Sequence, residues 1–195
     1  MDITLKPNIV FDYGNVLIQW DPHALYGPYF RDKEKEGYFL TKICNPQWNQ
    51  KIDRGESFED CIEERVKAFP EWEEPIRMYK SQWLDMCPGV IPGMEEMICS
   101  LKKDGRKIYG LSNFSLETFP NALERFPILC EINQYLLSGE VGYIKPQIEI
   151  FLIFLKRFNL KPEECIFIDD TKTNVDTAKM LGMDGVVFNS RKIKR

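Results

Sequence analysis

The sequence contains a single histidine, His23, among its 195 residues. Catalytic sites that need two or three histidine ligands, as most zinc hydrolases do, are therefore excluded from this chain alone. Long apolar runs are also lacking, since none approaches the roughly 18 residues of a membrane-spanning helix. Basic residues are fewer than acidic ones, 26 against 30, and the net charge of −4 argues against a general nucleic-acid-binding protein. We expect neither nucleic acid nor a membrane as the partner, and the sequence carries no signal for an oligomeric state.

The six cysteines show no C-x-x-C spacing, and the N-terminal residues MDITLKPNIVF contain no apolar leader segment. A chain of this size can bury a core without disulfides. We therefore expect reduced, mostly buried thiols in a cytoplasmic protein. The basic residues RKIKR at the C-terminus are expected to be a solvated end.

Strands and helices are predicted to alternate along most of the chain. Residues 8–13 form a short apolar run that is broken by glycine, and residues 94–105 show the apolar spacing of a helix. This alternation predicts an α/β fold, with a parallel sheet covered by helices on both faces. The further strands are expected at 106–113, 132–137, 165–170 and 185–188. The further helices are expected at 116–126, at 147–158 (with Ile148, Phe151, Leu152 and Leu155 facing inward) and from 173 to about 182.

Residues 22–90 interrupt this alternation with helical patterns only. Asp21 followed by Pro22 is a typical helix start, and Ser57 with Asp60 three positions later resembles a capping box. We expect a core of residues 1–20 and 91–195 and an inserted helical cap of residues 21–90. The four tryptophans are expected to lie mostly in the core, with one or two facing the substrate.

Polar side chains follow three of the predicted strands: Asp12, the pair Ser112–Asn113 and the pair Asp169–Asp170. Ligands of open parallel sheets bind beyond the carboxyl ends of the strands. A carboxylate there can act as a nucleophile, and converging carboxylates favour Mg²⁺. Lys145, before Pro146 in a predicted loop, can hold anionic oxygens. Such a set suits phosphoryl transfer.

The segments FDYGNVL, LSN, IKP and FIDDTKTN resemble, in this order, the four motifs of the haloacid dehalogenase-like (HAD) hydrolases. The resemblance covers the whole chain, and the D-x-G-N-V opening is similar to that of bacterial sugar-phosphate phosphatases acting on substrates such as glucose 1-phosphate. It implies a Rossmann-like core with a helical cap. It also implies a Mg²⁺-dependent phosphatase that acts on a small phosphorylated metabolite through an aspartyl-phosphate.

By this resemblance Asp12 is the nucleophile, and Ser112 and Lys145 are the other catalytic residues. The resemblance places Asp170 on the metal directly and Asp169 on it through water. Asn174 is implied to orient the loop that carries these acids. The remaining implied contacts are phosphate binding by Ser112, Asn113, Lys145 and Asn15, and metal binding by Asp12 and the backbone carbonyl of Gly14.

One position departs from the family pattern. The phosphatases usually carry a second Asp two residues after the nucleophile as general acid and base, but here that residue is Gly14. General acid–base help is worth about 10²–10⁴ in rate. Asp21 and His23 are nearby substitutes, although a helix cap and a structural or surface role are the preferred interpretations of these two residues.

Two alternatives to a phosphatase remain open at this point. The missing acid suggests a catalytically weak phosphate-binding or regulatory protein that keeps the fold. The other alternative is a 2-haloacid dehalogenase, in which Asp12 attacks carbon and forms an ester. That branch of the family needs no metal and does not usually carry the Asp–Asp pair.

Overall fold

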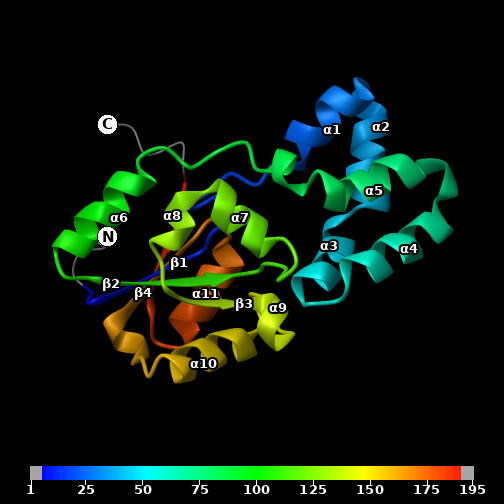
Figure 1. Cartoon of the computed structure of the whole chain (residues 1–195). Coiled ribbons are helices and arrows are strands. Elements are labelled where there is room, and N and C mark those ends of the chain that lie inside the picture. The colour runs from blue at the N-terminus through cyan, green and yellow to red at the C-terminus, as the bar shows by residue number, and fades with distance from the viewer. Residues whose placement is uncertain (1–5, 190–195) are drawn as a thin grey trace.

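A five-stranded parallel sheet forms the centre of the molecule in the computed structural model, which describes residues 6–189 (Figure 1). The predicted C-terminal RKIKR end lies outside the described residues. The strands are arranged in the order β3-β2-β1-β4-β5, and every neighbouring pair is parallel. The predicted α/β class is confirmed. The strands are β1 (Asn8–Phe11), β2 (Lys107–Ser112), β3 (Gln134–Leu137), β4 (Cys165–Asp169) and β5 (Asp184–Val187).

The central strands β1 and β4 are buried along their whole length, as expected for a parallel sheet covered on both faces. Alternate residues of β1 belong to different apolar clusters: Ile9 and Phe11 to one, Val10 to the other. The first cluster includes side chains of α6 (Met94–Lys103), α7 (Phe119–Arg125) and α8 (Pro127–Cys130). The second includes side chains of α10 (Ile148–Arg157) and α11 (Lys172–Met180). Figure 1 shows α6 to α8 on the opposite side of the sheet from α10.

The inward face of α10 differs from the prediction. Ile148 and Leu152 are 41% and 49% exposed, whereas Ile150 and Phe154 are buried. Phe151 and Leu155 are buried as predicted. The helix reads IEIFLIFLKR and is apolar on most sides, so the spacing of apolar residues fits more than one orientation. Packing against the sheet selects the orientation.

The five helices between β1 and α6 lie beside the sheet (Figure 1). Two of their starts are as predicted: the Asp21 carboxylate accepts a hydrogen bond from the His23 amide at 3.0 Å, and Ser57 Oγ accepts one from the Asp60 amide at 3.3 Å. The division at residues 21 and 90 into cap and core stays a prediction. The helices are α1 (Pro22–Phe30), α2 (Lys33–Tyr38), α3 (Pro46–Asp53), α4 (Phe58–Ala68) and α5 (Glu73–Ser81), with a π-helical stretch at Phe39–Ile43 and short 3₁₀ turns at Pro70–Trp72 and Trp83–Met86. Two further short segments follow β3 and α10: α9 (Ser138–Val141) and a 3₁₀ turn at Pro162–Glu164.

Aromatic packing holds these helices together. Trp48 and Trp83 are buried, and Trp20 and Trp72 are partly buried.

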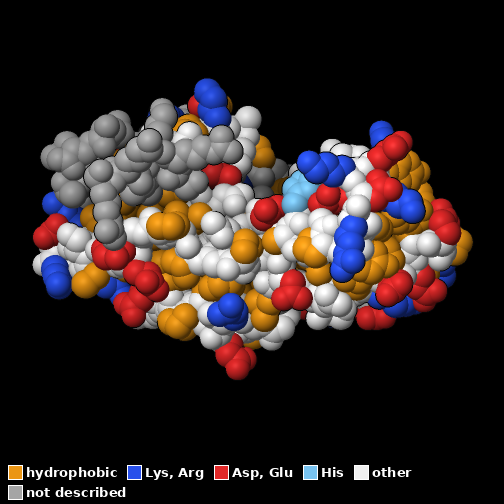
Figure 2. Space-filling view, turned by 90° about the horizontal axis from the view of Figure 1, so that it is seen from above, with side chains coloured by type: hydrophobic (Ala, Val, Ile, Leu, Met, Phe, Trp, Pro, Cys, Tyr) orange, Lys and Arg blue, Asp and Glu red, His pale blue; other side chains and the backbone are white. Residues whose placement is uncertain are grey.

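The six cysteines all fall within the described residues and are free thiols, four of them buried. Over residues 6–189 no helix is long and apolar enough to cross a membrane. On the face drawn in Figure 2, acidic and basic side chains are interspersed, without a continuous basic area.

Gly110 in β2 is required by the close approach of a buried ring. A Cβ at this position would lie 2.6 Å from Tyr13 Cζ, and Tyr13 is fully buried. We expect Gly110→Ala to lower the free energy of unfolding by about 1–3 kcal/mol through overpacking. At Gly37 in α2 a Cβ would enter open space, so Gly37→Ala should raise stability by about 0.5–1 kcal/mol. Urea denaturation measures both, and equal effects of the two substitutions would contradict this account.

Candidate active site

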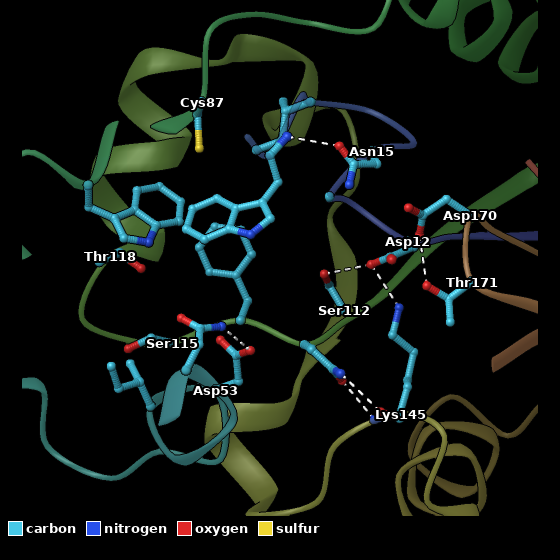
Figure 3. A pocket seen from close by; sticks show the side chains of 18 of the residues that line it. Asp12, Asn15, Asp53, Cys87, Ser112, Ser115, Thr118, Lys145, Asp170 and Thr171 are labelled. Carbon is cyan, nitrogen blue, oxygen red and sulfur yellow. Dashed lines mark hydrogen bonds and ion pairs between the residues drawn. The ribbon is translucent and has the colours of Figure 1, made fainter. Parts of the chain in front are cut away.

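The strand order brings three polar strand ends together at one edge of the sheet. Asp12 directly follows β1, and the flanking strands β2 and β4 end in Ser112 and Asp169. Asp12 and Ser112 line a cavity of about 230 Å³ together with Lys145 and Asp170 (Figure 3). The crevice lies where the sequence order of the strands reverses, which is the usual ligand position in open α/β sheets.

Asp12 is held by three donors on one carboxylate oxygen. Ser112 Oγ donates to Asp12 Oδ1 at 2.7 Å, the Tyr13 amide donates at 2.7 Å, and Lys145 Nζ lies 2.8 Å away. Within residues 6–189, no hydrogen bond is recorded to the second oxygen, Oδ2. The carboxylate is therefore fixed in orientation, with one oxygen available to a substrate or a cation.

Lys145 joins Asp12 to the next acid, Asp169. Its ammonium group lies 2.7 Å from Asp169 Oδ2, and both side chains are buried. Asn174 Nδ2 donates to the two oxygens of Asp169 at 3.0 Å each, and the Thr171 amide donates to Oδ1 at 2.8 Å. Asn174 therefore holds the carboxylate of Asp169 at the end of β4, and its supporting role in the reaction stays a prediction.

Burial is the largest single influence on the pKa values of these groups. Burial and, to a smaller extent, the charge of Asp169 raise the pKa of Asp12 to about 7, although Lys145 opposes them. Burial and the same neighbour raise the pKa of Asp170. Burial alone would lower the pKa of Lys145, but the carboxylates of Asp12 and Asp169 outweigh it and raise that pKa. The lysine therefore stays charged, while the acids repel one another.

The three carboxylates fit a divalent cation. Each of Asp12, Asp169 and Asp170 offers one ligand atom, and these atoms lie within 4.8 Å of one another. With the single positive charge of Lys145 the cluster carries a formal charge of −2 when ionised. Mg²⁺ prefers such oxygen ligands, and a bound cation favours the ionised acids. Gly14 lines the same cavity, and metal binding by its carbonyl stays a prediction.

Two asparagines predicted to bind phosphate have other partners here. Asn113 Oδ1 accepts from the Lys145 amide at 2.7 Å, and Asn113 Nδ2 donates to the Lys145 carbonyl at 3.1 Å. Asn15 Oδ1 accepts from the Trp20 amide at 3.0 Å, and its side chain also bonds Asp170. Both line the cavity. In this geometry they position neighbouring groups, and their phosphate contacts stay predictions.

The structure does not bring the two candidate substitutes for the missing acid into this cavity. Asp21 caps α1, as its preferred interpretation states. His23 is 67% exposed in its side chain and pairs with Glu36 at 2.7 Å. Asp21 lines a second cavity with Asn15 and Asp170, and neither Asp21 nor His23 lines the cavity of Asp12.

Several cavity residues were not predicted from the sequence. Asp53, the last residue of α3, lines the cavity together with Asn49 and Thr118. Of the tryptophans, of which one or two were expected to face the substrate, Trp20 and Trp83 line the cavity. The hydroxyl of Thr118 is buried and has no hydrogen-bond partner among the described residues. The distances of these residues from the four motifs in the chain do not indicate this position, so only the folded chain shows that they line the cavity of Asp12.

Comparisons with known proteins agree with this geometry. Residues 36–188 match the family model of haloacid dehalogenase-like hydrolases. The chain is 26% identical over 189 residues to the D-ribitol-5-phosphate phosphatase of Bacteroides thetaiotaomicron, covering 91% of this chain and 89% of that protein. It is 33% identical over 195 residues to drimenol cyclase drtB of Aspergillus calidoustus, covering 94% of this chain but about a third (34%) of that longer protein.

A solved structure shares the fold over nearly the whole chain. The HAD family enzyme bt-2542 of Bacteroides thetaiotaomicron, in complex with magnesium and inorganic phosphate, has a TM-score of 0.73 and 18% identity, with 95% of each chain covered. The family match extends over most of the chain. The chain therefore belongs to the haloacid dehalogenase-like hydrolase family, as the four motifs predict.

Cation binding gives a direct test of the carboxylate cluster. We expect Mg²⁺ at about 100 times its Kd to raise the Tm by about 5–10 °C, because binding at that excess stabilises by about 2.7 kcal/mol. Asp170→Asn should remove this shift. Asp176→Asn, which alters an acid paired with Lys172 on α11, should keep it. An unchanged Mg²⁺ shift in Asp170→Asn, measured by thermal denaturation, would contradict the site.

Proposed function

We propose that this chain is a Mg²⁺-dependent phosphatase that hydrolyses the monophosphate ester of a small metabolite. The observation that carries the proposal is the contact set of Asp12: Ser112, Lys145 and two further acids meet at one carboxylate. Phosphoryl transfer depends mostly on positioning and on charge neutralisation. This site has a fixed carboxylate and a buried cation for both purposes.

In the proposed reaction Asp12 attacks phosphorus and forms an aspartyl-phosphate. Lys145 and the Ser112 hydroxyl bind the phosphoryl oxygens, and Lys145 also offsets the charge of Asp169. Asp12, Asp169 and Asp170 would hold Mg²⁺, which supplies positive charge that stabilises the transferring phosphoryl group. Water then cleaves the intermediate at phosphorus and releases inorganic phosphate.

The acidic cluster favours this reaction over a dehalogenase reaction. A carbon–halogen displacement by Asp12 needs no divalent cation, yet Asp169 and Asp170 place two more carboxylates beside it. Without a cation, burial and the charge of Asp169 keep the pKa of the nucleophile raised. The full set of acids is therefore useful to a phosphatase and unfavourable to a metal-free enzyme.

The nucleophile is tested by substitution. With p-nitrophenyl phosphate and Mg²⁺, we expect wild-type turnover and its loss in Asp12→Asn, because an amide oxygen does not form the phosphoryl intermediate. Circular dichroism and the Tm check that the variant is folded. Wild-type turnover in folded Asp12→Asn would contradict the mechanism, whereas tight phosphate binding with no turnover across a panel of phosphates would favour the regulatory alternative.

The cavity beyond the phosphate site is both aromatic and polar, which supports a sugar or polyol phosphate as the substrate class. The rings of Trp20 and Trp83 lie 5.3 Å apart between centroids, and Trp83 and Phe114 are also 5.3 Å apart. Thr118, whose hydroxyl has no partner within residues 6–189, lines the same space. Buried hydroxyl groups are normally hydrogen-bonded, so a substrate hydroxyl is a suitable partner. The D-ribitol-5-phosphate phosphatase relative acts on a substrate of this class.

Thr118→Val tests this substrate class. We expect kcat/KM for sugar phosphates to fall about 2- to 10-fold, the value of one hydrogen bond, with little change for p-nitrophenyl phosphate. Stability should not fall, because the hydroxyl has no partner among the described residues. Thr41→Val, at an exposed position, is the control. Equal losses on both substrates would argue against a contact with a substrate hydroxyl.

A further inference from the structure

Asp53 brings a second carboxyl group to the cavity from the helical side. It is the last residue of α3 and lines the same space as Asp12 and Lys145. Figure 3 shows its side chain on a different wall of the cavity from Asp12. A phosphate ester bound at Asp12 in the proposed reaction would share this cavity with Asp53.

A chain of hydrogen bonds fixes the Asp53 carboxyl. Asn49 Nδ2 donates to Asp53 Oδ2 at 2.8 Å, and Tyr79 Oη donates to Asn49 Oδ1 at 3.0 Å. The tyrosine contact orients the amide so that its NH₂ group faces Asp53. In the described part of the chain no hydrogen bond is recorded to Asp53 Oδ1, which is therefore available to a ligand.

The backbone at Asp53 is also anchored to the sheet side of the molecule. Ser138 Oγ, at the start of α9, donates to the Asp53 carbonyl. Two residues later Gly55 packs against Gly139, so closely that a Cβ at Gly55 would lie 2.7 Å from the Gly139 carbonyl oxygen. These contacts determine how Asp53 lies relative to the strand ends.

The surroundings of Asp53 favour its protonated form. Burial and then the charge of Asp12 raise the pKa of Asp53 to about 7, while Lys145 opposes this shift. Its place at the C-terminus of α3 acts in the same direction, because the negative end of a helix dipole disfavours a carboxylate. A carboxyl group in this condition can both give and accept a proton near neutral pH.

We propose that Asp53 is the general acid and base of this enzyme, in the role that Gly14 leaves without a carboxylate. The proposal rests on the phosphatase function proposed above. It depends on the position of Asp53 across the cavity from Asp12, on its unpaired oxygen and on its anchoring by Asn49 and Ser138. Asp21 and His23, the candidates near the nucleophile in sequence, do not reach this cavity.

The proton transfers balance over one turnover. When Asp12 attacks phosphorus, the bond from phosphorus to the ester oxygen breaks, and the Asp53 carboxyl gives its proton to that oxygen, which leaves as an alcohol. The Asp53 carboxylate then takes a proton from the water that attacks the aspartyl-phosphate. The bond from Asp12 to phosphorus breaks, inorganic phosphate leaves and Asp53 is again protonated.

Leaving-group dependence tests this role. Nitrophenolate leaves without a proton, whereas an alkoxide does not, so Asp53→Asn should lower kcat/KM for an alkyl phosphate by about 10²–10⁴-fold and for p-nitrophenyl phosphate far less. The asparagine keeps the shape of the side chain and an acceptor for Asn49. Glu56→Gln, on the exposed loop after α3, is the matched control and should match wild type on both substrates.

A second variant separates a chemical role from a structural one. Gly14 has space for a side chain, since a Cβ there would lie 3.8 Å from its nearest neighbour, Trp20 Cβ. Gly14→Asp in the Asp53→Asn background should therefore restore part of the alkyl phosphate activity. Rescue with unchanged p-nitrophenyl phosphate activity would support the proposal.

Other outcomes overturn it in distinguishable ways. Equal losses on both substrates in Asp53→Asn, or no loss, would exclude Asp53 as the acid while leaving the phosphatase function intact, provided that Asp12→Asn is inactive. If the wild-type enzyme hydrolyses neither substrate with Mg²⁺, the proposed function fails and the role of Asp53 fails with it.

Discussion

The buried ammonium group of Lys145 lies between the carboxylates of Asp12 and Asp169, and the rest of the site depends on this arrangement. The three groups come from the loop after β1, from the end of β4 and from the loop before α10. Removing one partner of a buried ion pair typically costs about 3–5 kcal/mol, because a charge is left without compensation. The lysine therefore holds the carboxylates of Asp12 and Asp169 together. It also provides positive charge where phosphoryl oxygens would bind.

This arrangement also explains why the acids accept a cation. Lys145 offsets one carboxylate charge, but Asp12 and Asp170 still have raised pKa values. A divalent cation would offset the charge of the neighbouring acids and favour the ionised form of Asp12, which is the form needed for the proposed attack on phosphorus. On the helical side of the cavity, burial raises the pKa of Asp53 to about 7, which favours its protonated form near neutral pH. In the proposed mechanism, one cavity thus contains both the attacking carboxylate and the carboxyl group that transfers the proton.

Much of the fold and of the family motifs could be predicted from the sequence, because both depend on local patterns. The alternation of apolar runs and helical spacings predicts the parallel sheet, and Asp12, Ser112, Asp169 and Asp170 lie at strand ends by their position in the chain. The face of α10 could not be predicted, because that helix is apolar on most sides and Ile148 and Leu152 are exposed.

Asp53 could not be predicted for a different reason. Its distance from Asp12 in the chain carries no information, and its approach to the strand ends depends on contacts of Ser138 and Gly139 with the end of α3 and the loop after it. Asn113 shows a similar limit: its place beside Ser112 predicts phosphate binding, which stays a prediction, but the contacts of its amide with the backbone of Lys145 could not be predicted. Tertiary contacts determine such roles, and a linear pattern does not record them.

The central claim is that Asp12 carries the phosphoryl group during turnover. Acid quenching of the enzyme with Mg²⁺ and a phosphorus-labelled substrate in ¹⁸O-water, followed by mass spectrometry of the peptide containing Asp12, tests it most directly. The account predicts a phosphoryl group on Asp12 and ¹⁸O in the released phosphate. Turnover without any phosphorylated peptide, or ¹⁸O in the Asp12 carboxylate from attack at carbon, would contradict it.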